Sequence, residues 1–223
     1  MNLTLFDLDG TLLPFDSDHA FGEFMVERGW ADASGFRARN DAFLADHHAG
    51  RLDLAAYVDF ATAAWRARPM VEVLAARERF VAARILPLHA GALALVRAHQ
   101  GAGDRVAIVT ATNEFVTEPI AQAFGVADLI ALQLLRDAQG HVTGAIRGVP
   151  SYREGKVTRV IDWLAHEGRD WSSFERVTVY GDSLNDLPLL ERASEPVATN
   201  PAPALEALAR ERGWRVLRLF ETP

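Results

Sequence analysis

The chain has 223 residues, of which 49% are hydrophobic and 24% charged, and its formal net charge is −7. This length suits one large domain or one domain with an insertion. An acidic chain gives no support to nucleic-acid binding by bulk electrostatics. Cysteine is absent, which excludes disulfides, zinc–thiolate sites and cysteine nucleophiles.

The N-terminus and the apolar runs bear on where the protein works. Asp7 follows Met1 too soon for a secretory signal to fit. No apolar run approaches the ~20 residues that a membrane helix requires. We therefore expect a cytoplasmic protein, a monomer or a homodimer, with neither a membrane nor a nucleic-acid partner.

The first predicted elements are one strand and then several helices. Residues 3–6 form a short apolar run typical of a buried strand, and Gly10-Thr11 indicates a turn after it. From about residue 16 to about residue 86 the apolar spacing is helical, and no strand pattern occurs. Four residues are predicted to separate these helices: Gly29, Gly35, Gly50 and Pro69. The first helix has three candidate N-caps, namely Asp16, Ser17 and Asp18.

Strands alternate with helices from residue 87 onward. Apolar runs predict strands at 105–110, 128–135, 176–180, 195–199 and 214–219. Helical spacing predicts helices over 88–99, 116–124, 154–164, 187–190 and 204–212. Residues 134–146, with Asp137-Ala-Gln-Gly140 at their centre, are typical of a β-hairpin. The alternation predicts an α/β fold, with a Rossmann-like, mainly parallel sheet that has helices on both faces.

Polar side chains of several kinds occur near the predicted strand ends and helix starts. They are Asp7, Asp9, Thr110, Lys156, Asp182 and Asp186. Because the carboxyl ends of parallel strands meet at one edge of a sheet, we expect these residues to converge. Paired acids such as Asp7 and Asp9 are unfavourable unless a cation or a shared proton offsets them. The set suits phosphoryl transfer with Mg²⁺, which prefers oxygen ligands.

In these motifs the sequence resembles the haloacid dehalogenase (HAD) superfamily, and specifically its phosphoserine-phosphatase-like branch. The four motifs run in order along the chain: Asp7-Leu-Asp9-Gly-Thr11, Val109-Thr110, Gly155-Lys156 and Gly181-Asp182-Ser-Leu-Asn185-Asp186. The resemblance covers nearly the whole chain. It implies a HAD-like catalytic core at residues 1–15 and 87–223, with residues 16–86 inserted as an α-helical cap.

The resemblance also implies a phosphomonoester hydrolase that works through an aspartyl-phosphate. Asp7 would attack phosphorus. Asp9 would protonate the leaving alkoxide and then activate water. Mg²⁺ would be held by the Asp7 side chain, the Asp9 carbonyl and Asp182, with Asp186 completing or orienting the metal shell.

Four residues are expected to contact the phosphate group. The resemblance implies that Thr110, Lys156 and Asn185 hold the phosphate oxygens, with the backbone N–H near Ala111 assisting. Lys156 at a helix start adds its charge to the helix dipole. Asn185 has a second interpretation as a helix cap.

The leaving group is expected to come from a small phosphorylated metabolite, such as the amino-alcohol phosphates phosphoserine and histidinol phosphate. Asp16 corresponds in position to the glutamate that meets the substrate's amino group in phosphoserine phosphatases, and a helix N-cap is its alternative role. The arginine expected to meet a serine carboxylate has three candidates: Arg51, Arg66 and Arg68.

Two departures from the branch weaken the assignment of phosphoserine as the substrate. Thr110-Ala111-Thr112 stands where Ser-Gly-Gly is usual, and Ser183 stands where Gly is usual. The alternatives are a phosphotransferase of the same fold, a phosphonatase, and a non-catalytic binding protein that keeps the fold. Residues 16–86 contain no lysine for a Schiff base, which counts against a phosphonatase. The intact Asp7 and Asp9 disfavour a non-catalytic protein.

Overall fold

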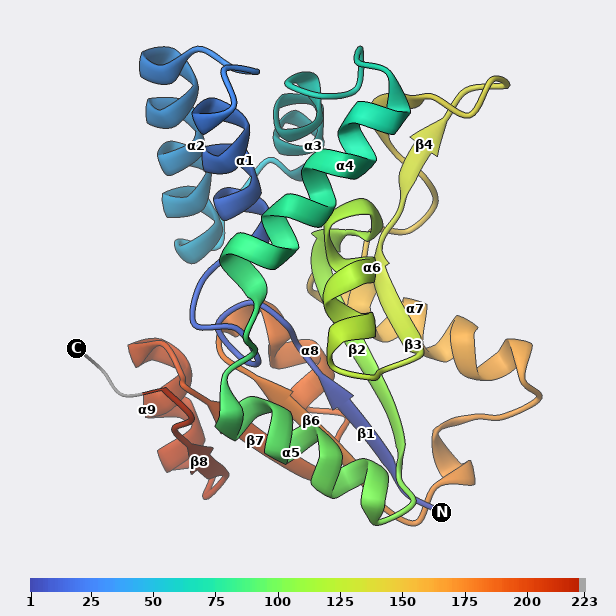
Figure 1. The fold of residues 1–223 in the computed structure, drawn as a ribbon. Coiled ribbons are helices and arrows are strands. Elements are labelled where there is room, and N and C mark those ends of the chain that lie inside the picture. The colour runs from blue at the N-terminus through green and yellow to red at the C-terminus, as the bar shows by residue number, and fades with distance from the viewer. Residues whose placement is uncertain (221–223) are drawn as a thin grey trace.

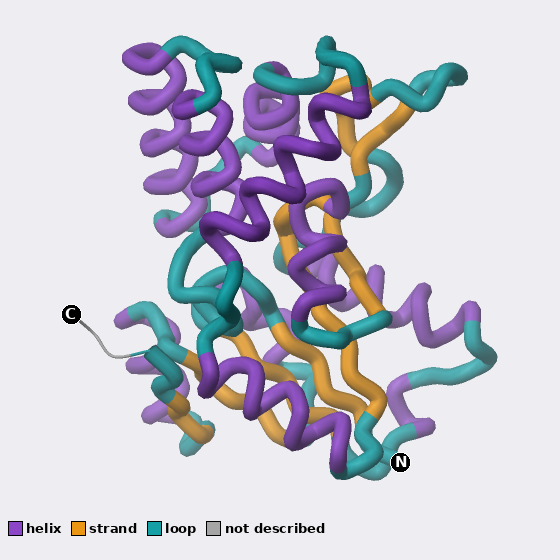
Figure 2. The backbone as a smooth tube through the Cα atoms, viewed as in Figure 1, coloured by secondary structure: helices purple, strands orange, loops and turns teal. Residues whose placement is uncertain are grey.

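Six parallel strands form the central sheet of this computed structural model, which describes residues 1–220 (Figures 1 and 2). Their order across the sheet is β3-β2-β1-β6-β7-β8. The strands are β1 Leu3–Phe6, β2 Arg105–Asn113, β3 Asp128–Leu132, β6 Val177–Gly181, β7 Glu195–Thr199 and β8 Arg215–Leu217. The prediction of a mainly parallel α/β sheet is confirmed.

Helices cover both faces of this sheet, as the sequence predicts. Side chains alternate along β1, so that Leu3 and Leu5 pack on one face and Phe6 on the other. The helices over the Phe6 face are α5 (Ala90–Gly101) and α6 (Glu114–Ala123). The helices over the Leu5 face are α7 (Glu154–His166), α8 (Leu187–Leu190) and α9 (Pro203–Glu211). Because both faces are covered, β1 and β6 are buried along their whole length, and β2 along almost all of it.

Four helices lie between β1 and α5 in the chain. They are α1 Ser17–Glu27, α2 Ala33–His48, α3 Leu54–Ala63 and α4 Met70–Phe80, and a π-helical turn, Val81–Ile85, follows α4. In Figure 1 they stand above the sheet, on the side toward which β1 points. They therefore lie on the same side of the molecule as the carboxyl ends of the strands.

Aspartates are the N-cap residues of the first three of these helices. Asp16 is the N-cap of α1, and its side chain accepts a hydrogen bond from the His19 N–H at 2.8 Å. The predicted helix break at Gly35 is wrong. Gly35 lies in the first turn of α2, where its N–H donates to the N-cap Asp32 at 2.6 Å. An N-cap bond of this kind starts a helix, so the glycine does not end one.

The predicted hairpin is present as β4 (Leu134–Arg136) and β5 (Val142–Ile146), which pair antiparallel. β5 packs against α3, so this part of the chain meets the inserted helices. Two 3-10 turns, Trp171–Ser173 and Leu184–Asp186, complete the regular structure of residues 1–220.

Within the described residues no single helix is long and apolar enough to cross a membrane. The segments Met70–Ile85 and Ala90–Gly101 have the length and composition only as a pair, and they are bent by 103°.

Candidate active site

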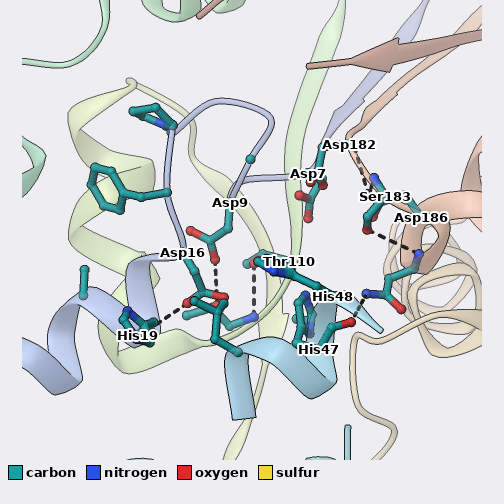
Figure 3. A pocket seen from close by; sticks show the side chains of 18 of the residues that line it. Asp7, Asp9, Asp16, His19, His47, His48, Thr110, Asp182, Ser183 and Asp186 are labelled. Atoms are coloured by element: carbon teal, nitrogen blue, oxygen red, sulfur yellow. Dashed lines mark hydrogen bonds between the residues drawn. The ribbon is translucent and has the colours of Figure 1, made fainter. Parts of the chain in front are cut away.

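Three carboxylates from the ends of two neighbouring strands form the centre of the site. Asp7 follows β1, and its N–H donates to the carbonyl of Tyr180 in β6 at 2.9 Å. Asp182 follows β6, and Asp186 ends the 3-10 turn after it. One carboxylate oxygen of each acid lies within 4.8 Å of the others. Figure 3 shows Asp7, Asp182 and Asp186 together at one side of the cavity.

Two glycines make room for these acids. Gly10 has a φ of +77°, and a Cβ there would lie 2.4 Å from Asp182 Oδ2. A Cβ on Gly181 would lie 2.6 Å from Asp186 Cβ. The glycines of the first and fourth motifs therefore allow the backbone to approach the acids closely.

Lys156 lies between two of the acids and is the only lysine in the sequence. Its Nζ donates to Asp7 Oδ1 and to Asp186 Oδ1, each at 2.6 Å, and the residue is 2% exposed. Burial favours the neutral amine, but the charges of Asp186 and Asp7 outweigh it and raise the pKa of Lys156 above its ordinary value. The ammonium group is therefore held charged inside the acidic cluster.

The acids carry more charge than Lys156 can offset. Burial, followed by the charge of Asp186, raises the pKa of Asp7 to about 7, although Lys156 opposes the shift. Burial and then Asp186 also raise the pKa of Asp182 well above its ordinary value. A group of buried carboxylate oxygens with unbalanced negative charge is the donor set that a hard divalent cation prefers. These residues fit Mg²⁺.

The carboxyl group of Asp9 is held apart from this cluster. Its Oδ1 accepts the Ser17 N–H at 2.9 Å and its Oδ2 accepts the Thr112 hydroxyl at 2.8 Å. Burial, followed by the charges of Asp16 and Asp7, raises the pKa of Asp9 well above its ordinary value. The side chain is thus held toward β2 and α1. Metal ligation by its carbonyl stays a prediction.

The predicted phosphate-binding residues surround one cavity. Thr110, Ala111, Lys156 and Asn185 all line it, together with the four aspartates of the two acidic motifs. The Thr110 Oγ1 accepts the Thr112 N–H at 3.1 Å, and the pairing of β2 with β3 shifts register between Val109 and Asn113. β2 extends three residues beyond the predicted end at Thr110, and this extension brings Thr112 to the site.

The cavity holds about 320 Å³, and helices α1 and α2 form its other wall. Three histidines lie on this wall, which we call the histidine wall: His19 from α1, and His47 and His48 from α2. Burial is the main cause that lowers the pKa of His47 below its ordinary value. Asp16 lines the same cavity while it caps α1, so both of its expected roles are compatible with its position.

The three candidate arginines do not line the cavity. Arg51 pairs with Asp46, and Arg66 pairs with Asp59. Arg68 lies over the ring of Trp30, with its Cζ 4.4 Å from the ring centroid. Within residues 1–220, Lys156 is the one lysine or arginine among the residues that line this cavity.

Sequence reasoning missed five residues around the site. Thr112, His19, His47 and His48 line the cavity, and Arg153 bonds to Asn185 at 3.2 Å. Thr112 had a weak signal, since it follows Thr110 at the spacing of one strand face. The histidines and Arg153 had none, because the packing of α1 and α2 against the rest of the chain brings the histidines to the cavity and places Gly50 beside Arg153.

Known proteins match this chain along nearly its full length. The model of the haloacid dehalogenase-like hydrolase family matches residues 4–191. Histidinol-phosphatase of Neisseria meningitidis is 41% identical, over 97% of this chain and 98% of that protein. Phosphoserine phosphatase SerB1 of Mycobacterium tuberculosis is 30% identical, over 95% of this chain and 68% of that protein.

Solved structures share the fold. A protein of unknown function from Bordetella pertussis superposes with a TM-score of 0.92 at 45% identity, covering 98% of this chain and 99% of that one. A substrate-bound phosphoserine phosphatase superposes with a TM-score of 0.69 at 18% identity, covering 96% and 91%. With the order of its motifs and the gathering of their residues at one cavity, this chain belongs to the haloacid dehalogenase-like hydrolase family.

Proposed function

We propose that this phosphatase is a Mg²⁺-dependent phosphomonoester hydrolase, that it works through an aspartyl-phosphate, and that its substrate is an amino-alcohol phosphate such as histidinol phosphate. That it is a phosphatase rests on its family and on its identity with histidinol-phosphatase over almost all of both chains. The observation that carries the mechanism is the different environment of two acids. Asp7 lies among carboxylates and an ammonium group, whereas Asp9 is hydrogen-bonded to Thr112 and Ser17.

Asp7, Asp182 and Asp186 would hold the metal ion. When bound, Mg²⁺ supplies positive charge that offsets the carboxylates and the phosphate. The chain itself provides Lys156, whose two hydrogen bonds fix Asp7 and Asp186 in place. A carboxylate held in this way is oriented before the substrate arrives.

The reaction has two steps at phosphorus. First, a carboxylate oxygen of Asp7 bonds to phosphorus while the ester P–O bond breaks, and Asp9 gives its proton to the departing alkoxide. Then water attacks phosphorus, Asp9 takes back a proton, and the bond from Asp7 to phosphorus breaks to release inorganic phosphate. The raised pKa of Asp9 suits a group that must be protonated for the first step.

The charges around the cavity support a cationic leaving group. Asp16 contributes a carboxylate beside the histidine wall, and the arginines that could meet a substrate carboxylate bind elsewhere. An ammonium group on the substrate would meet acceptors there, whereas a carboxylate would meet like charge. This charge pattern favours histidinol phosphate over phosphoserine.

We assign residues 16–86 the role of a cap that covers the substrate and excludes water. α1 and α2 already form one wall of the cavity, opposite the acids of the sheet edge. A wall built from a separate group of helices can vary with the leaving group while the chemistry at Asp7 stays the same.

A substrate panel tests the proposal. The protein is stripped with EDTA and assayed for phosphate release from histidinol phosphate, O-phosphoserine and p-nitrophenyl phosphate, with and without added Mg²⁺. We expect release that depends on Mg²⁺ and is fastest with histidinol phosphate. Faster release from O-phosphoserine would overturn the substrate assignment. Transfer of phosphate to an added alcohol in preference to water would identify a phosphotransferase. Inactivity on all three esters would contradict the proposed reaction.

A further inference from the structure

Arg153 has a backbone conformation that is unusual for its residue type. It lies directly before α7, with φ of 50° and ψ of −123°. Residues that carry a Cβ rarely adopt positive φ, because this backbone conformation is strained for them. Such strain persists only where surrounding contacts impose it. Among residues 1–220 the other non-glycine with positive φ is Asn200, a residue type that tolerates this region. The contacts of Arg153 must therefore account for its strained position.

The Arg153 guanidinium joins the core to the end of α2. Its Nη2 donates to the carbonyl of Gly50, and its Nε donates to Asn185 Oδ1 at 3.2 Å. Gly50 follows α2 with a φ of +68°, and a Cβ there would lie 2.6 Å from Arg153 Nη2. The glycine thus gives the arginine space as well as an acceptor. This contact links two segments 103 residues apart in the chain.

The same contacts fix the orientation of the Asn185 amide. A guanidinium only donates, so the Asn185 oxygen faces Arg153. The Asn185 Nδ2 then faces the His47 carbonyl, to which it donates at 3.4 Å. An amide nitrogen carries two N–H groups, which leaves one N–H for a ligand in the cavity that Asn185 lines.

We propose that Arg153 is a positioning residue for the phosphatase reaction. It holds the end of α2 against the segment that follows β6 and contains Asn185, residues 182–186, which we call the Asn185 loop. The histidine wall and the free N–H of the Asn185 amide then keep fixed positions around the substrate. The inference rests on the proposed function, because it gives Asn185 and α2 a substrate to hold. Arg153 itself does not line the cavity.

Two substitutions at this position separate positioning from stability. Arg153→Gly removes the guanidinium and also relieves the strain at positive φ, whereas Arg153→Ala removes the guanidinium and keeps the strain. We therefore expect Arg153→Gly to have the higher Tm of the two. Both variants should raise the KM for p-nitrophenyl phosphate by about tenfold or more with a smaller change in kcat, since misplacement of binding groups has effects of this order.

Arg51→Ala is the matched control. Arg51 lies next to Gly50, carries the same charge and pairs with Asp46 rather than with Asn185. Its loss should leave the KM for p-nitrophenyl phosphate near that of wild type. Hydrogen exchange of residues 44–52 provides a readout that does not depend on activity. The amides of this segment should exchange faster in Arg153→Gly and stay unchanged in Arg51→Ala.

The outcomes distinguish this inference from the function on which it rests. A wild-type enzyme that hydrolyses no phosphate ester contradicts the proposed function. An active wild type with an Arg153→Gly variant of equal KM and equal exchange in residues 44–52 overturns the positioning role. Loss of activity only in proportion to a lower Tm, with Arg153→Gly restored to wild-type kinetics, would reduce Arg153 to a structural residue.

Discussion

The hydroxyl of Thr112 donates to Asp9 Oδ2 at 2.8 Å, and with the Ser17 N–H it holds the Asp9 carboxyl away from the acidic cluster around Asp7. This bond stabilises the ionised form of Asp9 and opposes the shift that burial imposes on its pKa. If Asp9 is the proton donor that we propose, this bond sets the pH range over which it can donate.

Thr112→Val should move the alkaline limb of the pH profile of kcat/KM to higher pH. Valine has the same shape but no hydroxyl, so the ionised form of Asp9 loses a donor and its pKa rises further. Asp9 then stays protonated to higher pH, so it can still protonate the leaving alkoxide in the first step at that pH. The profile is measured with p-nitrophenyl phosphate against wild type. A limb that stays in place or moves to lower pH would exclude Asp9 as the proton donor.

Asp7→Asn should abolish phosphate release, with a loss of more than about 10³-fold, which is the scale of effect when a nucleophile is removed. An amide cannot form the acyl phosphate, although it still fills the space of the carboxylate. The rate is measured with saturating Mg²⁺, and the Tm confirms that the variant is folded. Activity within tenfold of wild type would show that another residue attacks phosphorus.

Lys156→Arg should also lose most of its activity, by roughly 10²-fold, because a planar guanidinium cannot replace a compact ammonium at this site. Lys156 is almost fully buried and donates to two carboxylates at 2.6 Å each. Lys156→Met removes the charge altogether and should lower the free energy of unfolding by about 3–5 kcal/mol, the cost of an unpaired buried charge. Both are measured by urea unfolding and by kinetics. An arginine variant with normal kinetics would show that charge alone is sufficient.

Asp16 can be tested without loss of its helix cap. Asparagine is as good an N-cap as aspartate, whereas alanine costs about 0.5–2 kcal/mol at this position. If Asp16 recognises an ammonium group, Asp16→Asn should raise the KM for histidinol phosphate by about tenfold or more and leave that for p-nitrophenyl phosphate nearly unchanged. Asp16→Ala should add a lower Tm. Equal changes in KM for both esters would assign Asp16 to the cap alone.

Asp104 gives a prediction for stability far from the site. Burial opposes its ionisation, but hydrogen bonds from His99, Asn2 and Thr4 outweigh burial and lower the pKa of Asp104 below its ordinary value of 3.8. A group with a depressed folded-state pKa stabilises the fold above its unfolded-state pKa, and this contribution is lost as pH falls through the folded-state value. Asp104→Asn should therefore lower the urea midpoint at pH 7, and the difference from wild type should shrink as pH falls below 3.8. A difference that is independent of pH would contradict this account.

Much of the fold could be predicted because burial on both faces of a sheet leaves a strong pattern. The runs around β1, β2 and β6 are mostly apolar and carry no charged residue between Val106 and Asn113 or within β1 and β6, and each ends in a motif rich in aspartate, threonine or glycine. Since the strands are parallel, their ends meet, and Asp7 and Asp182 are close as expected. The error at Gly35 has a local cause, because a glycine in a first helical turn has the same composition signal as one in a loop.

The residues that escaped prediction depend on contacts between distant segments. His47 reaches the cavity because α2 packs against the Asn185 loop, and Arg153 reaches Gly50 across the same contact. Periodicity describes which side of a helix is apolar, but it does not say against which loop the helix will end. The wall that α1 and α2 contribute to the cavity is therefore the part of the site that the sequence describes least.

The pairing of β1 with β6 has a consequence for when the candidate site forms during folding. Asp7 directly follows β1, yet Lys156, which bonds to it, lies 149 residues further along the chain, and Asp182 and Asp186 follow later still, after β6. Contacts of such long sequence separation form late, after the entropy of closing the intervening chain has been overcome. A chain in which β6 has not yet paired with β1 therefore has Asp7 but not the cluster of Lys156, Asp182 and Asp186 around it. The candidate site is complete only when β6 and the turn that follows it have folded against β1.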